Sequence, residues 1–136
     1  MVYVTRRETF SASHRLHNPA LSEAQNLQIF DKCNNPHGHG HNYELEVTVA
    51  GPVRSETGYV VDLKVLKEVI RREIIAKVDH KHLNHDVEMF RDVIPTAENI
   101  ARVFWTVLAP KIPGGTLHLI RLRETENNVV EYRGEP

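Results

Sequence analysis

The sequence of 136 residues predicts one α+β domain, residues 1–136, in which two helices cover one face of a four-stranded antiparallel sheet. Three observations support this prediction. Strand-like segments lie near both ends of the chain, two amphipathic helical patterns lie between them, and the length is that of a single domain. The expected order of elements is therefore ββααββ.

The first two strands follow from residue type and alternation. Residues 2–10 are rich in β-branched and aromatic side chains, and the extended pattern continues loosely to His14. A long excursion with a weak helical patch at residues 21–30 separates this strand from the next. Residues 39–50 alternate apolar and polar side chains, as a half-buried antiparallel strand does. Turn residues then lead to a short return strand expected at residues 59–61.

Both helices have a recognisable start. Asp62 is the expected N-cap of a helix over residues 63–78, whose apolar residues recur at spacings of three and four. The second helix follows Pro95, with Thr96 as its N-cap and an apolar stripe that ends at Leu108.

The last two strands are expected at residues 116–125 and 129–133. With both helices on one side, this sheet leaves its other face and two edges open. Open edges and faces are usually covered by assembly, so we expect a homo-oligomer.

Composition excludes two classes of partner. Hydrophobic residues make up 40% and charged residues 26%, which is typical of a soluble globular protein. Because 17 Lys and Arg are matched by 18 Asp and Glu, the broad basic field of a nucleic-acid-binding protein is missing.

No apolar run reaches the roughly 18 residues of a membrane span, and the first residues lack a signal sequence. A single cysteine suits a reducing compartment, so a cytoplasmic protein is expected.

Histidine clustering indicates a metal site. Six of the nine histidines lie in two short stretches, residues 37–41 and 80–85. In an extended strand His39 and His41 project to the same side, and His14 supplies a third imidazole if the first two strands pair. Three neutral imidazoles with an open fourth position are the pattern of a catalytic zinc site. On spacing alone, His37 is an equal candidate.

Three further positions have both a catalytic and an ordinary interpretation. Cys33 lies beside Lys32, which favours a reactive thiolate, but a lone cysteine is often an inert buried residue. Asp79 and His80 form either a relay or a helix-end charge pair. Glu124 is either an ordinary strand carboxylate or an acceptor for two N–H groups of a guanidine-like heterocycle.

Five stretches in fixed order resemble a known family over essentially the whole chain. They are residues 10–16 (FSASHRL), 32–43 (KCNNPHGHGHNY), 78–83 (VDHKHL), 95–99 (PTAEN) and 124–128 (ETENN). This combination resembles the 6-pyruvoyltetrahydropterin synthase family of the animal type.

The resemblance implies a lyase of tetrahydrobiopterin biosynthesis that converts 7,8-dihydroneopterin triphosphate to 6-pyruvoyltetrahydropterin and releases triphosphate, using Zn2+ with Mg2+ assisting. It also implies the tunnelling fold, assembled into a barrel-forming homo-hexamer of two trimers. The residue roles implied by the motifs are zinc ligation by His14, His39 and His41, base catalysis by Cys33, a relay of Asp79 and His80, and pterin binding by Glu124, with Thr96 and Glu98 near the pterin pocket.

One departure leaves an alternative open. The animal enzymes carry asparagine where this sequence has His37. The related 6-carboxytetrahydropterin synthase of the queuosine pathway shows Cys-x3-His-Gly-His, and the spacing from Cys33 to His37 and His39 also fits that pattern.

Overall fold

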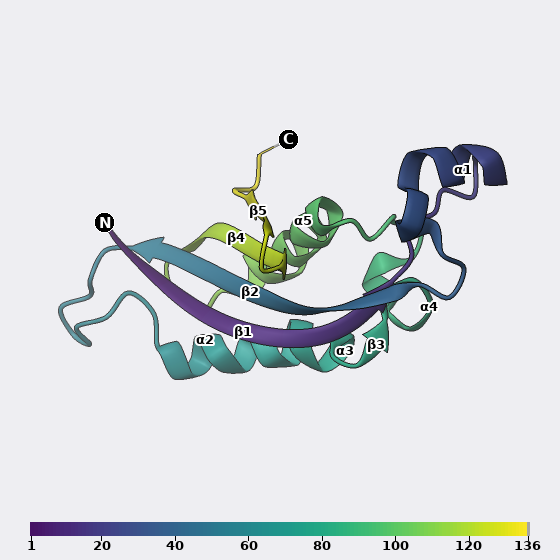
Figure 1. Cartoon of the computed structure of the whole chain (residues 1–136). Helices are drawn as coiled ribbons and strands as arrows, with labels where there is room; N and C mark the ends of the chain where they lie inside the picture. The colour runs from purple at the N-terminus through teal and green to yellow at the C-terminus, as the bar shows by residue number, and fades with distance from the viewer. Residues whose placement is uncertain (136) are drawn as a thin grey trace.

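The computed structural model describes residues 1–135 and shows a curved five-stranded sheet whose two long helical segments pack on one face, while a short helix near residue 25 lies beyond the end of the sheet (Figure 1). The strands are β1 (Val2–His14), β2 (His39–Gly51), β3 (Lys81–His82), β4 (Thr116–Thr125) and β5 (Asn128–Tyr132). Their order across the sheet is β3-β1-β2-β4-β5, and all neighbours are antiparallel except β3 and β1. The α+β class is confirmed, but the sheet is mixed and not purely antiparallel.

Two details of the predicted sheet were wrong. The fifth strand, β3, has only two residues and pairs parallel with Ala12 and Ser13 of β1, so it is too short to show a strand period. The return strand expected at residues 59–61 does not form. Those residues lie in a bend that one main-chain hydrogen bond, from the Arg54 N–H to the Tyr59 carbonyl at 3.2 Å, ties to the preceding turn.

The helical segments include several short pieces that the sequence pattern did not reveal. The segments are α1 (Glu23–Phe30), η1 (Asp31–Asn34), α2 (Leu63–Ile70), the π-helical η2 (Arg71–Ile75), α3 (Ala76–Val78), α4 (Leu83–Asp86), η3 (Glu88–Phe90), α5 (Ala97–Leu108) and η4 (Ala109–Lys111). Both predicted N-caps are confirmed. The Asp62 carboxylate accepts the Lys64 N–H at 2.9 Å, and the Thr96 hydroxyl accepts the Asn99 N–H at 3.2 Å.

The π-helical turn is compatible with the spacing of the buried residues around it. Ile70, Ile74 and Val78 are fully buried and lie four residues apart, a spacing longer than the 3.6 residues of an α-helical turn. In a regular α-helix their direction would drift by about 40° at each step. The wider turn of η2 keeps this stripe on the sheet and carries the chain to Asp79 and His80.

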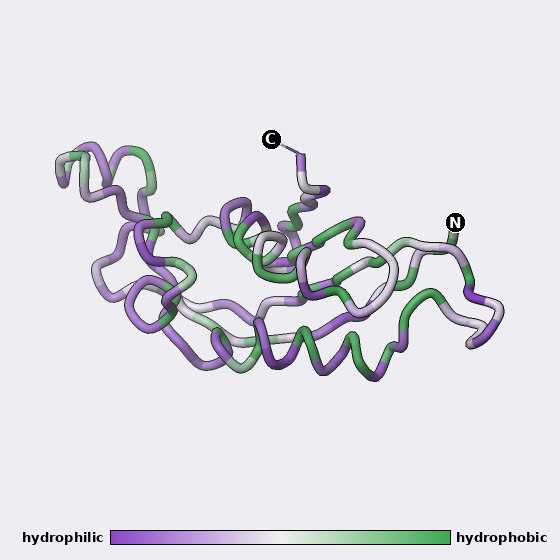
Figure 2. Tube along the Cα trace, turned by 180° about the vertical axis from the view of Figure 1, so that it is seen from behind, coloured by the Kyte–Doolittle hydropathy of each residue, from purple (hydrophilic) through white to green (hydrophobic). Residues whose placement is uncertain are grey.

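The core lies between the sheet and these helices. Tyr43, Leu45 and Val47 of β2 are fully buried, and the Tyr43 ring stacks on Phe10 with 4.7 Å between centroids. Phe104 of α5 meets Phe10 edge-on. Figure 2 shows hydrophobic and hydrophilic residues alternating at short intervals along the α2–α3 run, as a helix with one buried face requires. Each large side chain buried here contributes about 1.5–3 kcal/mol.

The opposite face of the sheet carries charged side chains. Glu44 pairs with Arg7 at 3.3 Å and with Arg123 at 3.5 Å.

Within residues 1–135, β3 pairs with β1 only at Ala12 and Ser13, so the outer edge of β1 from Val2 to Ser11 has no strand partner. The open face and edge that the sequence predicted are therefore present. In the same part of the chain, no helix has both the length and the apolar character needed to span a bilayer.

Candidate metal centre and surrounding cavities

Pairing of β1 with β2 brings three histidines together. His14 lies opposite His39 in the antiparallel register, and His41 follows two residues later on the same face. Their candidate ligand atoms all lie within 4.8 Å of one another. His37 is exposed and outside this group, and its N–H is bonded to the Asn35 side chain at 3.1 Å. The group that could hold an ion in the structure therefore contains His39 and His41 and not His37.

A main-chain carbonyl orients His14. Its Nδ1 lies 2.7 Å from the Pro95 carbonyl oxygen, which can only accept, so Nδ1 carries the hydrogen and Nε2 presents a lone pair to the site. That Nε2 is 3.3 Å from Nε2 of His39. Two nitrogens bound tetrahedrally to one ion at 2.0–2.1 Å would be separated by about 3.3–3.4 Å. The separation of these two nitrogens therefore matches that of two ligands of one ion.

Burial favours the neutral, metal-binding form of two of the three imidazoles, His14 and His41. Burial lowers the pKa of His14 to about 4, and repulsion from the other two histidines adds to the effect. Burial also lowers the pKa of His41, whose Nε2 is buried without a hydrogen-bond partner. Neutral nitrogen donors with an unpartnered buried lone pair suit zinc, copper, iron or nickel and not magnesium or calcium. These three residues can hold such an ion.

A carboxylate cavity adjoins the histidines. Oε2 of Glu124, near the end of β4, lies 4.0 Å from Nε2 of His14. Glu124 also lines a cavity of about 580 Å3 together with Thr96 and Glu98 at the start of α5. Residues from two motifs far apart in sequence, Thr96 and Glu98 from one and Glu124 from the other, are therefore brought to one cavity next to the metal centre.

Tyr43 also contacts the centre, which the sequence did not indicate. Its side chain is fully buried and its hydroxyl lies 3.4 Å from Nδ1 of His14. Burial, together with the charge of Glu124, raises the pKa of Tyr43 above its usual range, so the phenol stays protonated. Alternation with His39 and His41 placed Tyr43 on the correct face, and only the fold shows that it reaches His14.

Cys33 lies on a second cavity. It belongs to η1, is partly exposed, and lines a space of about 680 Å3 together with Lys32 and His39. A cavity that joins Cys33 to one of the three histidines gives its thiol access to a molecule bound at the centre.

Asp79 and His80 form a tethered pair at the end of α3. The Asp79 carboxylate accepts the Ser11 N–H at 2.9 Å and lies 3.1 Å from Nδ1 of His80. The hydrogen bond from Ser11 is the larger of two contacts that lower the pKa of Asp79 below its usual value, and the contact with His80 is the smaller. His80 has a φ of +61°, which costs on the order of 1–3 kcal/mol, and its N–H bonds the Ser11 carbonyl at 2.6 Å. The expected pairing of Asp79 with His80 is present.

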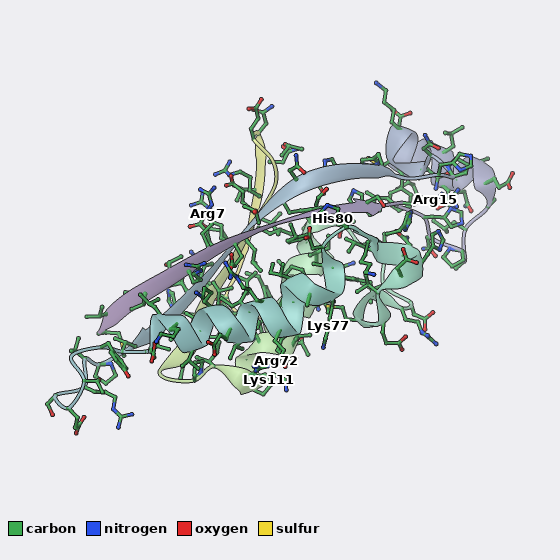
Figure 3. The ribbon with its side chains drawn as sticks, turned by 90° about the horizontal axis from the view of Figure 1, so that it is seen from below. Arg7, Arg15, Arg72, Lys77, His80 and Lys111 are labelled. Atoms are coloured by element: carbon green, nitrogen blue, oxygen red, sulfur yellow. The ribbon has the colours of Figure 1, made fainter. Side chains whose placement is uncertain are left out.

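The pair does not share the cavity of Cys33. The His80 side chain is 82% exposed, and neither Asp79 nor His80 lines the cavity that contains Cys33. Figure 3 shows His80 beside β1, whereas Arg15, which follows His14 in the chain, lies farther toward the end that carries α1. Within one chain, the three expected catalytic side chains are therefore in two separate places.

Comparison with known proteins identifies the family. The family described as 6-pyruvoyl tetrahydropterin synthase matches residues 3–135. The human protein named 6-pyruvoyl tetrahydrobiopterin synthase is 48% identical over 132 residues, which cover 97% of this chain and 91% of that protein. A protein of the same name from Poecilia reticulata is 47% identical over 133 residues, covering 98% and 90%.

A solved structure agrees with these sequences. The 6-pyruvoyl tetrahydropterin synthase of Caenorhabditis elegans superposes with a TM-score of 0.93 at 38% identity, covering 98% of this chain and 96% of that one. The chain therefore belongs to the 6-pyruvoyl tetrahydropterin synthase family of lyases.

Proposed function

We propose that this chain is a zinc-dependent lyase that converts 7,8-dihydroneopterin triphosphate to 6-pyruvoyltetrahydropterin and triphosphate, in the cytoplasm, as a step of tetrahydrobiopterin biosynthesis. The observation that carries the proposal is the position of Glu124, which lies 4.0 Å from a ligand of the three-histidine centre and lines the cavity beside it. A pterin held there would place its side chain toward the metal.

Zinc is the ion that we assign to the centre, and it is one of those that the donor set suits. His14, His39 and His41 would hold it, leaving a position open for the substrate. When bound, zinc polarises the hydroxyl oxygens of the substrate side chain and stabilises the negative charge that develops when a carbon-bound proton leaves. Magnesium is assigned to the triphosphate, because a hard ion prefers phosphate oxygens to imidazole.

Glu124 is assigned to the pterin. Its two carboxylate oxygens can accept two N–H groups from the guanidine-like edge of the ring, a pairing stronger than hydrogen bonds between neutral groups. Thr96 and Glu98 line the same cavity and are assigned to its wall. This arrangement fixes the ring and leaves the three-carbon side chain free to reach the centre.

Cys33 is assigned the role of base. As a thiolate it removes the carbon-bound proton, and the electron pair left behind expels triphosphate from the adjacent carbon. His80, held by Asp79, returns a proton during the tautomerisation that follows. Tautomerisation moves the reducing equivalents from the side chain to the ring, so the reaction needs no nicotinamide or flavin.

The assembly is proposed to be a homo-hexamer of two trimers with the strands closed into barrels. The unpaired edge of β1 supports it, because an exposed edge of this length is normally covered by another strand. The separation of His80 from the Cys33 cavity supports a shared site, in which Asp79 and His80 act on the Cys33 of a neighbouring copy.

The alternative is the carboxy-forming enzyme of the queuosine pathway. Its spacing, Cys-x3-His-Gly-His, would make His37 and His39 the ligands. The metal group contains His39 and His41, so five residues separate Cys33 from the first ligand on this strand. That spacing favours the pyruvoyl-forming reaction.

Product analysis tests the function. The zinc-loaded protein is incubated anaerobically with 7,8-dihydroneopterin triphosphate and magnesium, and products are identified by mass, with Glu124→Gln as the control that keeps the side-chain shape and removes the charge. We expect 6-pyruvoyltetrahydropterin and triphosphate from the unmodified chain. Acetaldehyde would establish the carboxy-forming reaction instead, and absence of turnover by the zinc-loaded protein would overturn the proposal.

A further inference from the structure

Two asparagine side chains form hydrogen bonds with the main chain of Arg15 and Leu16, the two residues after His14. Within the sheet, a neighbouring strand forms such bonds. β1 ends at His14, yet the main chain of Arg15 and Leu16 remains hydrogen bonded on both sides. On each side an asparagine carboxamide supplies bonds that a neighbouring strand supplies elsewhere in the sheet. Asn84 does so on the side of β3, and Asn34 does so on the side of β2.

Asn84 mimics a strand partner of Arg15. Its Oδ1 accepts the Arg15 N–H at 2.8 Å, and its Nδ2 donates to the Arg15 carbonyl at 2.8 Å. Asn84 belongs to α4, which follows β3 directly. These two bonds continue the contact between β1 and β3 beyond the last paired residues, Ser13 and His82, to Arg15 and Asn84.

Asn34 forms the other side together with the main chain of Cys33. The Leu16 N–H donates to the Cys33 carbonyl at 2.8 Å, and Nδ2 of Asn34 donates to the Leu16 carbonyl at 2.9 Å. Nδ2 also lies 2.9 Å from Nδ1 of His17, which accepts its second hydrogen. The Arg15 Nε–H donates to the Asn34 carbonyl at 2.9 Å. Four bonds thus join residues 15–17 to Cys33 and Asn34.

We infer that Asn34 is a positioning residue, whose carboxamide holds Cys33 at a fixed place relative to the metal ligand His14. The inference rests on the proposed role of Cys33. Asn34 is the next residue in the chain after Cys33, and its partners follow His14 by two and three residues. A carboxamide is the one side-chain group of this size with two N–H donors, and both are used here.

Loss of the two carboxamide bonds would leave Cys33 and Asn34 joined to residues 15–17 only through their main-chain carbonyls. The thiol could then shift, although no atom of the metal centre or of the Glu124 cavity is removed. A misplacement of about 1 Å can lower a rate by about 100-fold when reacting groups must be aligned. No hydrogen bond of the histidines or of Glu124 is lost, and Leu16, which lines the Glu124 cavity, keeps its N–H bond to the Cys33 carbonyl. We therefore expect metal binding and substrate binding to be retained. The effect should therefore fall on kcat and not on KM.

The test compares Asn34→Ala and Asn34→Asp with Asn26→Ala. The aspartate variant keeps the shape of the side chain but removes both donors, so it decides the question if the alanine variant does not fold. Asn26 is the matched control, because its fully buried carboxamide bonds the main chain of Asn18, Leu21 and Ser22 in the same excursion, and none of these bonds goes to Cys33 or to residues 15–17. Turnover, zinc affinity and the rate of Cys33 alkylation by iodoacetamide are measured for each folded variant.

We expect the Asn34 variants to lose at least about tenfold in kcat while KM and zinc affinity stay within about twofold. Their Cys33 alkylation rate should change by at least about threefold, and Asn26→Ala should leave kcat and alkylation within about twofold of the unmodified chain. Unchanged kcat and alkylation in the Asn34 variants, or an equal effect of Asn26→Ala, would overturn the inference. If the unmodified protein does not turn over, the proposed function fails, and the alkylation comparison still decides whether Asn34 positions Cys33.

Discussion

Acidification should destabilise the metal-free protein through His14. Burial lowers the pKa of this histidine in the folded chain to about 4, whereas its ordinary value, expected after unfolding, is 6.5. Between these values the unfolded chain binds more protons than the folded chain. The stabilisation is therefore fully present above pH 6.5 and is lost as the pH falls toward 4.

The size of the effect follows from the two values. The difference between 6.5 and about 4 corresponds to about 3 kcal/mol when fully expressed, at about 1.4 kcal/mol per pH unit. Between pH 7 and pH 5 the loss from His14 alone is about 2 kcal/mol. His41, whose pKa burial also lowers, acts in the same direction. This interval lies above the range in which ordinary carboxylates titrate.

Urea unfolding at a fixed chain concentration, after removal of metal by a chelator, measures this loss. His14→Gln is the control, because glutamine does not titrate and keeps an amide that can donate to the Pro95 carbonyl. The quantity compared is the change in unfolding free energy between pH 7 and pH 5, not its absolute value. If His14→Gln loses as much free energy over this interval as the unmodified chain, the attribution to His14 is wrong.

Three other predictions concern the site. Cys33→Ala should lower turnover by at least about 100-fold and leave zinc binding and folding intact, and full activity would exclude Cys33 as the base. Mixed assemblies of Cys33→Ala and His80→Ala chains should regain activity that neither variant has alone, whereas no recovery in verified mixed assemblies would place the site within one chain. Gly38→Ala should weaken zinc binding at least about tenfold in a chelator competition, because residue 38 has a φ of +73° and an added Cβ would lie 2.7 Å from the His14 carbonyl oxygen. Unchanged affinity would show that this turn is not needed to place the ligands.

Local patterns were sufficient for the long elements of this fold. Alternation predicted β2 and the face that carries His39 and His41, and the capping residues Asp62 and Thr96 predicted the starts of α2 and α5. The two-residue β3 could not be predicted in the same way, because its pairing with β1 joins residues almost 70 positions apart and leaves no local period.

The site required the pairing of strands far apart in sequence. Spacing gave His37 and His41 equal claims as partners of His39. The fold separates them, because β2 begins at His39, so that His37 lies in an exposed turn and His41 lies on the strand. The contact of Tyr43 with His14 and the nearness of Glu124 also depend on the tertiary fold. The motifs identified which residues to examine, while the fold determined which of them lie together.

Zinc titration of the metal-free protein tests the central claim most directly. Product formation from 7,8-dihydroneopterin triphosphate is followed as zinc is added, with His41→Ala treated in parallel, since His41 presents a buried nitrogen without a hydrogen-bond partner. We predict that activity rises linearly and stops rising at one zinc ion per chain, and that the variant stays inactive at the same zinc concentrations. Full turnover by the metal-free protein, or by His41→Ala, would contradict the assignment of the three-histidine centre.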